Sequence, residues 1–175
     1  MFPKAHAAAY VMSAIRLGWY KIYYPMEFYA AFLTVAPGGF DAEIVMGGLS
    51  SINATLEALE NTGTKATQKE QEQHTTLLLV REALCRGVRF LPVSLMHSHA
   101  TAFLPENGQI RMPFNSLGGL GISAAERIVQ CREEGEIFSV EELRQKAGLS
   151  KSVIALLRRC GALDGLSETN QFTLF

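Results

Sequence analysis

Cysteine, net charge and long apolar runs are all scarce in this chain. Its 175 residues include three widely spaced cysteines and no Cys-x-x-Cys pair, which indicates neither a disulfide framework nor a zinc site. The formal net charge of −1 gives no overall basic signature, so any nucleic-acid signal has to be local. No stretch approaches the ~20 apolar residues of a membrane span. These absences favour a cytoplasmic protein with no membrane contact.

The composition is that of a globular, mainly α-helical protein, with 48% hydrophobic and 19% charged residues. Apolar and alanine-rich patterns predict helices over 3–24, 25–35, 41–61 and 62–87, the third weakened by the paired glycines at 47 and 48. The first two helices are apolar on most sides, which is typical of helices buried between other elements, and we expect too few such elements in this chain to bury them.

A small β-hairpin is predicted over residues 98–112. The sequence PENG, with its proline, asparagine and glycine, separates HATAFL from QIRM and is typical of a tight turn. His97 and His99 would share one face of a strand, but no third ligand is near in sequence. A metal site is therefore not expected in this chain.

A phosphate-binding turn is predicted at Gly119-Leu120-Gly121, directly before a helix. Glycines allow positive φ and close backbone approach, and free N–H groups at a helix start bind anions. We interpret Ser123 and Glu126 as a capping box that fixes this helix start, and Ser139 and Glu142 as a second box. Arg127 and Arg132 could add charge for a phosphate.

A second helix-turn-helix unit follows, in which Ser150, Lys151, Ser152, Arg158 and Arg159 could have the same role. Both units share a Gly-Leu-Gly or Gly-Leu-Ser turn before a helix, which we interpret as a degenerate internal repeat. The arrangement resembles a tandem helix-hairpin-helix module, which grips the DNA backbone without reading bases. The alternative is a plain helical hairpin whose glycines serve only packing.

Three separated stretches together resemble one family. MFPKAHAAAYVMSAIRLGWYKIYYP, PFNSLGGLGISAAERIVQCREEGEIFSVEELRQKAGLSKSVIALLRRCGALDGL and NQFTLF occur in this order in the C-terminal part of the PolC-type alpha subunit of bacterial DNA polymerase III, the replicative polymerase of Gram-positive bacteria. Family members are far longer. The expectation is therefore an internal piece that starts at an in-frame methionine, or a truncated or split gene product.

The resemblance implies a role for each stretch. The first would lie in the polymerase fingers near the incoming nucleotide, and its candidate residues are Lys4, His6, Tyr10 and Arg16. Lys4, His6 and Arg16 could instead pair with acidic residues of the missing domains. The middle stretch would hold duplex DNA through Gly119, Leu120, Gly121, Ser123, Arg127, Ser150 and Lys151. No catalytic residue is assigned, because the carboxylates and the magnesium they bind would belong to a palm domain outside this chain.

The end of the chain resembles the family's motif for docking on the β sliding clamp. Gln171, Leu174 and Phe175 match that motif, whereas Phe172 stands where leucine is usual and Thr173 where serine or aspartate is common. Residues 165–170 would form a polar spacer that gives the tail reach. Packing of Phe175 on the chain's own hairpins is the alternative.

The expected organisation follows from these assignments. Residues 1–64 would be the C-terminal part of the fingers, 65–112 a helix and β-hairpin connector, 113–166 the tandem helix-hairpin-helix domain and 167–175 an extended clamp-binding tail. The expected partners are duplex DNA, the clamp and the remainder of the alpha subunit. Two other functions stay open: a stand-alone DNA-binding adaptor that tethers to the clamp, and a purely structural helical domain.

Overall fold

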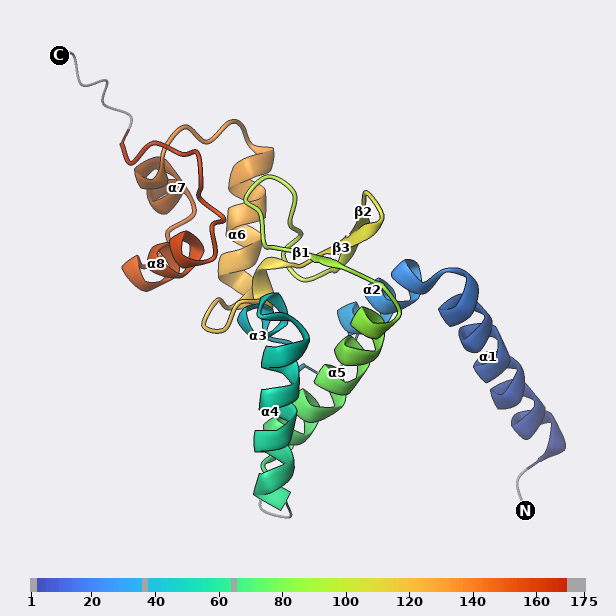
Figure 1. The fold of residues 1–175 in the computed structure, drawn as a ribbon. Helices are drawn as coiled ribbons and strands as arrows, with labels where there is room; N and C mark the ends of the chain where they lie inside the picture. The colour runs from blue at the N-terminus through green and yellow to red at the C-terminus, as the bar shows by residue number, and fades with distance from the viewer. Residues whose placement is uncertain (1–2, 36–37, 64–65, 170–175) are drawn as a thin grey trace.

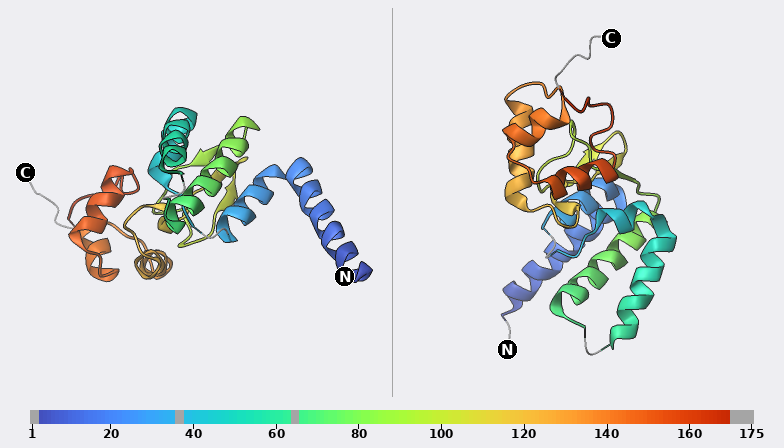
Figure 2. Two further views of the ribbon diagram at one scale, coloured as in Figure 1. Left: turned by 90° about the horizontal axis from the view of Figure 1, so that it is seen from below. Right: turned by 90° about the vertical axis from the view of Figure 1, so that its left-hand side faces the viewer.

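A computed structural model describes residues 3–35, 38–63 and 66–169. Helix α1 (Lys4–Tyr23) and helix α2 (Pro25–Val35) meet at Tyr24, whose φ of −134° and ψ of 59° interrupt the helical course before Pro25. Figures 1 and 2 show α1 projecting away from the rest of the molecule, while α2 lies against it. No residue of α1 is buried, although its sequence is apolar on most sides.

The predicted helix over 41–61 is divided into α3 (Ala42–Met46) and α4 (Gly48–Thr62). Gly48 has φ of +72°, which breaks the helix between the paired glycines. The Asp41 carboxylate caps α3 by accepting hydrogen bonds from the N–H groups of Glu43 and Ile44. Helix α5 (Gln68–Cys85) packs beside α4, and the two helices form an elongated pair (Figure 1).

A three-stranded sheet with the order β1-β3-β2 lies at the centre of the molecule. The predicted hairpin is formed by β2 (Leu104–Glu106) and β3 (Gln109–Arg111), whose turn has positive φ at Asn107 and Gly108. The strands are shorter than predicted because His99 Nδ1 accepts hydrogen bonds from the N–H groups of residues 101 and 102, which bend the chain into a turn. Strand β1 (Phe90–Leu91), parallel to β3, was not predicted.

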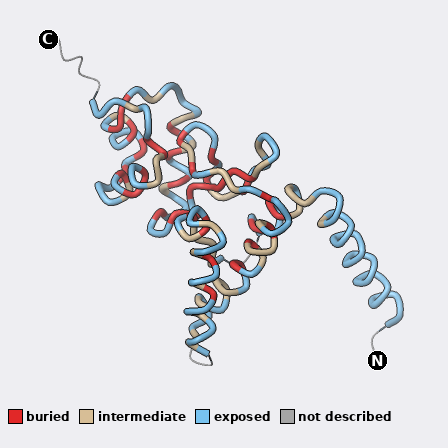
Figure 3. Tube along the Cα trace, in the orientation of Figure 1, coloured by how far each residue is buried: buried red, intermediate tan, exposed pale blue. Residues whose placement is uncertain are grey.

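The C-terminal part contains a 3-10 helix, η2 (Phe114–Ser116), followed by α6 (Ile122–Glu133), α7 (Val140–Lys146) and α8 (Lys151–Arg159). One apolar core runs from α2 through the sheet to these helices, as the buried segments in Figure 3 show. The prediction of a mainly helical fold with a small β-hairpin and a helix-hairpin-helix unit is confirmed. Among the described residues, no helix is long and apolar enough to cross a membrane.

Candidate nucleic-acid interface

The first predicted turn joins η2 to α6. Gly119 has φ of +94°, a conformation that favours glycine, and Leu120 is buried behind it. Gly121 is the N-cap of α6 with φ of −74° and ψ of 156°, so its backbone conformation is open to any residue. A methyl group at either glycine would meet no other atom within 4 Å. The backbone of this turn is therefore accessible to another molecule.

The second turn joins α7 to α8 and repeats this geometry. Gly148 has φ of +59°, Leu149 is buried, and Ser150 is the N-cap of α8 with φ of −71° and ψ of 158°. Ser150 Oγ accepts a hydrogen bond of 3.3 Å from the N–H of Val153. Each unit thus places a left-handed glycine, a buried leucine and an extended N-cap in succession, which matches the predicted internal repeat.

Both helix starts present open backbone donors. Within the ranges that the structure describes, the N–H groups of Gly121, Ile122 and Ser123 donate no hydrogen bond, and neither do those of Lys151 and Ser152. These groups lie at the positive ends of α6 and α8, where the helix dipole favours an anion. Two such donor sets suit the phosphates of a nucleic-acid backbone and carry no information about base sequence.

The capping box predicted from Ser123 and Glu126 is wrong. Ser123 lies inside α6, and the N-cap Gly121 has no side chain that could cap the helix. Ser139 does cap α7, because its Oγ accepts a hydrogen bond of 3.1 Å from the N–H of Glu142. The exposed Ser123 hydroxyl makes no hydrogen bond to any described residue, so it remains accessible at the helix start.

The cations predicted to bind phosphate differ in the contacts that they make within the protein. Arg127 donates from Nε to the carbonyl oxygen of Ala147 at 2.8 Å and so links α6 to the second turn. Arg132 donates from Nη1 to the carbonyl oxygens of Leu95 and Ser98, so this nitrogen is engaged within the protein. Lys151 is exposed and makes no ion pair within the described part of the chain.

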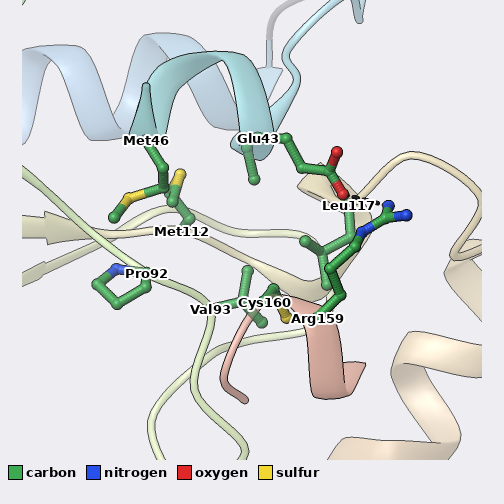
Figure 4. Close-up of a pocket in the computed structure, with 9 residues that line it drawn as sticks. Glu43, Met46, Pro92, Val93, Met112, Leu117, Arg159 and Cys160 are labelled. Carbon is green, nitrogen blue, oxygen red and sulfur yellow. Dashed lines mark hydrogen bonds and ion pairs between the residues drawn. The ribbon is translucent and has the colours of Figure 1, made fainter. Parts of the chain in front are cut away.

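Arg159 forms an ion pair with Glu43 of α3, beside a cavity of about 320 Å³ that Figure 4 shows in close-up. Leu117, which precedes the first turn, and Cys160, which follows α8, both line this cavity. Burial raises the pKa of the Cys160 thiol, which disfavours the reactive thiolate. The two hairpin units therefore meet α3 here, and Arg159 serves this contact.

The four predicted fingers residues, Lys4, His6, Tyr10 and Arg16, are all exposed on α1. The rings of His6 and Tyr10 lie 4.6 Å apart between centroids, in an edge-to-face arrangement. At 100° per residue, Lys4 and Arg16 point away from that pair and from each other. The structure thus brings together His6 and Tyr10 but not the four residues as one site.

The four predicted clamp-binding residues lie outside the described residues: Gln171, Phe172, Leu174 and Phe175. The polar segment before them is fastened to α7 and is not the free spacer that was expected. The N–H of Val140 donates to the carbonyl oxygen of Ser167 at 2.9 Å, and that of Glu141 donates to the carbonyl oxygen of Glu168 at 3.1 Å. Glu168 also forms an ion pair with Arg158, which sequence reasoning missed.

Comparison with known proteins agrees with this geometry. A family model described as a helix-hairpin-helix motif matches residues 87–172, which include both turns. The structure and this match together define a helix-hairpin-helix domain in the C-terminal half of the chain.

Relatives that match over the whole length of this chain identify the particular family. The chain is 43% identical to DNA polymerase III PolC-type of Caldanaerobacter subterraneus subsp. tengcongensis. It is 44% identical to the proteins of the same name from Clostridium perfringens and Thermotoga petrophila. All 175 residues are covered in each comparison, and they span 12% or 13% of the relatives' length. The chain belongs to the family of PolC-type DNA polymerase III.

Proposed function

We propose that this chain supplies sequence-independent binding of duplex DNA to a replicative DNA polymerase of the PolC type, as its C-terminal part. The observation that carries the proposal is the pair of matched turns with open N–H groups at the starts of α6 and α8. Two donor sets and a few cations are expected to neutralise about 2–4 phosphates, which makes the affinity modest and strongly dependent on salt.

Fluorescence anisotropy of labelled duplexes tests this proposal. Three duplexes of unrelated sequence should bind the 175-residue chain with similar affinity. The logarithm of the affinity should fall with the logarithm of the salt concentration with a slope of about −2 to −4. A strong preference for one sequence, or binding that is insensitive to salt, would contradict binding through the phosphate backbone of the DNA. No binding at low salt would support the purely structural alternative.

The proposal assigns polymerisation to the remainder of the polymerase. Phosphoryl transfer needs carboxylates that hold metal ions, and no group of three or more candidate metal ligands lies among the described residues. The purified chain should therefore extend no primer with magnesium or manganese. Nucleotide incorporation by preparations free of contaminating polymerase would overturn this assignment.

Helix α1 is proposed to pack against the remainder of the polymerase, with Lys4, His6, Tyr10 and Arg16 near the incoming nucleotide. Supporting this, α1 exposes large apolar side chains that include Val11, Ile15 and Trp19, and such patches are typical of protein interfaces. In the full-length polymerase, Ile15→Asp should destabilise the fingers. Lys4→Ala should raise the KM for nucleotide, whereas Lys69→Ala on α5 should leave it unchanged.

Docking on the β sliding clamp is proposed for the tail, on the basis of the match at Gln171, Leu174 and Phe175. Burial of the last two side chains would contribute roughly 3–6 kcal/mol before the cost of ordering the peptide. A peptide of residues 167–175 should bind the clamp, and the double change Leu174→Ala and Phe175→Ala should abolish binding. Thr173→Ser is the matched control and should bind like the parent. If the double change instead lowers the melting temperature of the whole chain, the tail belongs to its own core.

A further inference from the structure

A hollow of about 380 Å³ lies between α7 and α8, and the proposed contacts at the helix starts do not account for it. Three cations line it: Arg144, Lys151 and Arg158. Two carboxylates, Glu141 and Glu168, line it as well. Since Lys151 is also the first residue of α8, the hollow is continuous with the second candidate phosphate contact.

Glu168 is brought to this hollow by the main chain. Ser167 forms an isolated parallel bridge with Ser139, and its Oγ donates to the carbonyl oxygen of Phe138 at 2.8 Å. The N–H of Glu141 donates to the carbonyl oxygen of Glu168. The Glu168 carboxylate is thereby held beside Arg158, with which it forms an ion pair. The pair is open to solvent, because 49% of the Arg158 side chain and 70% of the Glu168 side chain are exposed.

We infer that this hollow is a further phosphate site of the hairpin domain, beside the two at the helix starts, and that Glu168 occupies the position of the backbone phosphate when nucleic acid is absent. The inference rests on the proposed duplex binding. A carboxylate and a phosphodiester both accept hydrogen bonds from the same guanidinium donors, so they compete for Arg158. Because the pair is exposed, a phosphate can displace the carboxylate at small cost.

Coupling to the tail follows from this competition. Binding effects between two sites are reciprocal, so a duplex that takes Arg158 weakens the hold of Glu168. Glu168 lies three positions before Gln171, the first residue that resembles the clamp motif. Binding of duplex DNA would thus loosen the root of the predicted clamp-binding tail.

Charge neutralisation at Glu168 tests the inference by duplex anisotropy on the 175-residue chain. Glu168→Gln should raise the affinity by about two- to fivefold, the factor that an exposed ion pair represents. Arg158→Gln should weaken binding and lower the salt slope by about 0.9. In the Arg158→Gln background, Glu168→Gln should have no further effect. Glu57→Gln on α4 removes the same charge far from the hollow and serves as the control.

The outcomes distinguish failure of the proposed duplex binding from failure of the inference about Glu168. If the parent chain binds no duplex, the proposed function fails and the inference fails with it. If it binds, but Glu168→Gln equals Glu57→Gln or still strengthens binding without Arg158, only the inference fails. Inorganic phosphate at equal ionic strength should lower the duplex affinity of the parent chain more than that of Arg158→Gln, because it competes for the same guanidinium donors. Equal competition in both proteins would overturn the assignment of a backbone phosphate to this hollow.

Discussion

Valine at Gly119 and valine at Gly121 should affect different properties. The first should chiefly lower stability, and the second should chiefly weaken DNA binding. Gly119 has φ of +94°, a conformation that a β-branched residue adopts only under strain. Gly121 has φ of −74° and ψ of 156°, which valine adopts readily. Since a Cβ atom at either position lies more than 4 Å from every residue except its chain neighbours, the backbone conformation is what separates their effects on folding.

The structure sets the size of each effect. Strain in the left-handed region costs about 1–3 kcal/mol, so Gly119→Val should lower the melting temperature by several degrees. Gly121→Val loses only the advantage of glycine over valine as an N-cap, on the order of 0.5–1 kcal/mol. In a duplex complex, however, its isopropyl group would hold the phosphate away from the N–H groups of Ile122 and Ser123. Loss of one charge-assisted hydrogen bond of about 1.5–3 kcal/mol corresponds to at least about tenfold weaker binding.

Two measurements on the same variants test these effects on stability and binding: thermal unfolding by circular dichroism and duplex anisotropy at low salt. Gly121→Ser is the matched control, because the second turn carries Ser150 at the corresponding N-cap, and it should retain both stability and binding. Gly121→Val with unchanged duplex affinity would refute the idea that DNA approaches this turn. Gly119→Val with unchanged stability would refute the strain argument.

Three further outcomes follow from individual contacts. Lys151→Ala should lower the salt slope of duplex binding by about 0.9, since one phosphate contact is lost, whereas Lys69→Ala on α5 should not change it. Arg111 lowers the pKa of Glu106 chiefly through their hydrogen bonds. The pair therefore stabilises the fold above the ordinary glutamate pKa. This stabilisation disappears as the pH falls through the lowered pKa of Glu106. Glu106→Gln should therefore cost about 1–3 kcal/mol at pH 7 in urea unfolding and less in acid, because it leaves the buried Arg111 without its anion. Deletion of residues 1–17 should leave the melting temperature almost unchanged, as none of those described is buried, and a large decrease would contradict the exposed position of α1.

Local patterns in the sequence are sufficient to predict the helices and both turns. The glycine-leucine pairs at 119–120 and 148–149 specify a left-handed residue followed by a buried side chain, and the Asn107-Gly108 turn specifies the β-hairpin. The capping box at Ser123 failed because serine in the first turn of a helix produces the same sequence pattern as serine at the N-cap. Only the backbone angles of Gly121 distinguish the two positions.

Contacts between distant residues could not be predicted in this way. Strand β1 is two residues long and pairs with β3 at a separation of twenty residues, Phe90 opposite Ile110. No periodicity develops over so short a strand. The ion pairs that engage Arg158 and Arg159 join α8 to Glu168 and Glu43, and spacing along the chain gives no indication of either. From the sequence, both arginines are candidate phosphate ligands, whereas the structure shows that each has a carboxylate partner.

Helix α1 shows that an apolar sequence pattern can predict a helix without determining whether it is buried. Its sequence is apolar on most sides, a pattern typical of a helix surrounded by other elements. The helix forms over Lys4–Tyr23, yet Tyr10, Trp19 and Tyr23 are exposed. Helix formation depends on residues within the helix, whereas burial depends on what lies beside it. The chain spans 12% of the length of its relative from Clostridium perfringens, and the exposed apolar side chains of α1 are the observation on which its proposed packing against other polymerase segments rests.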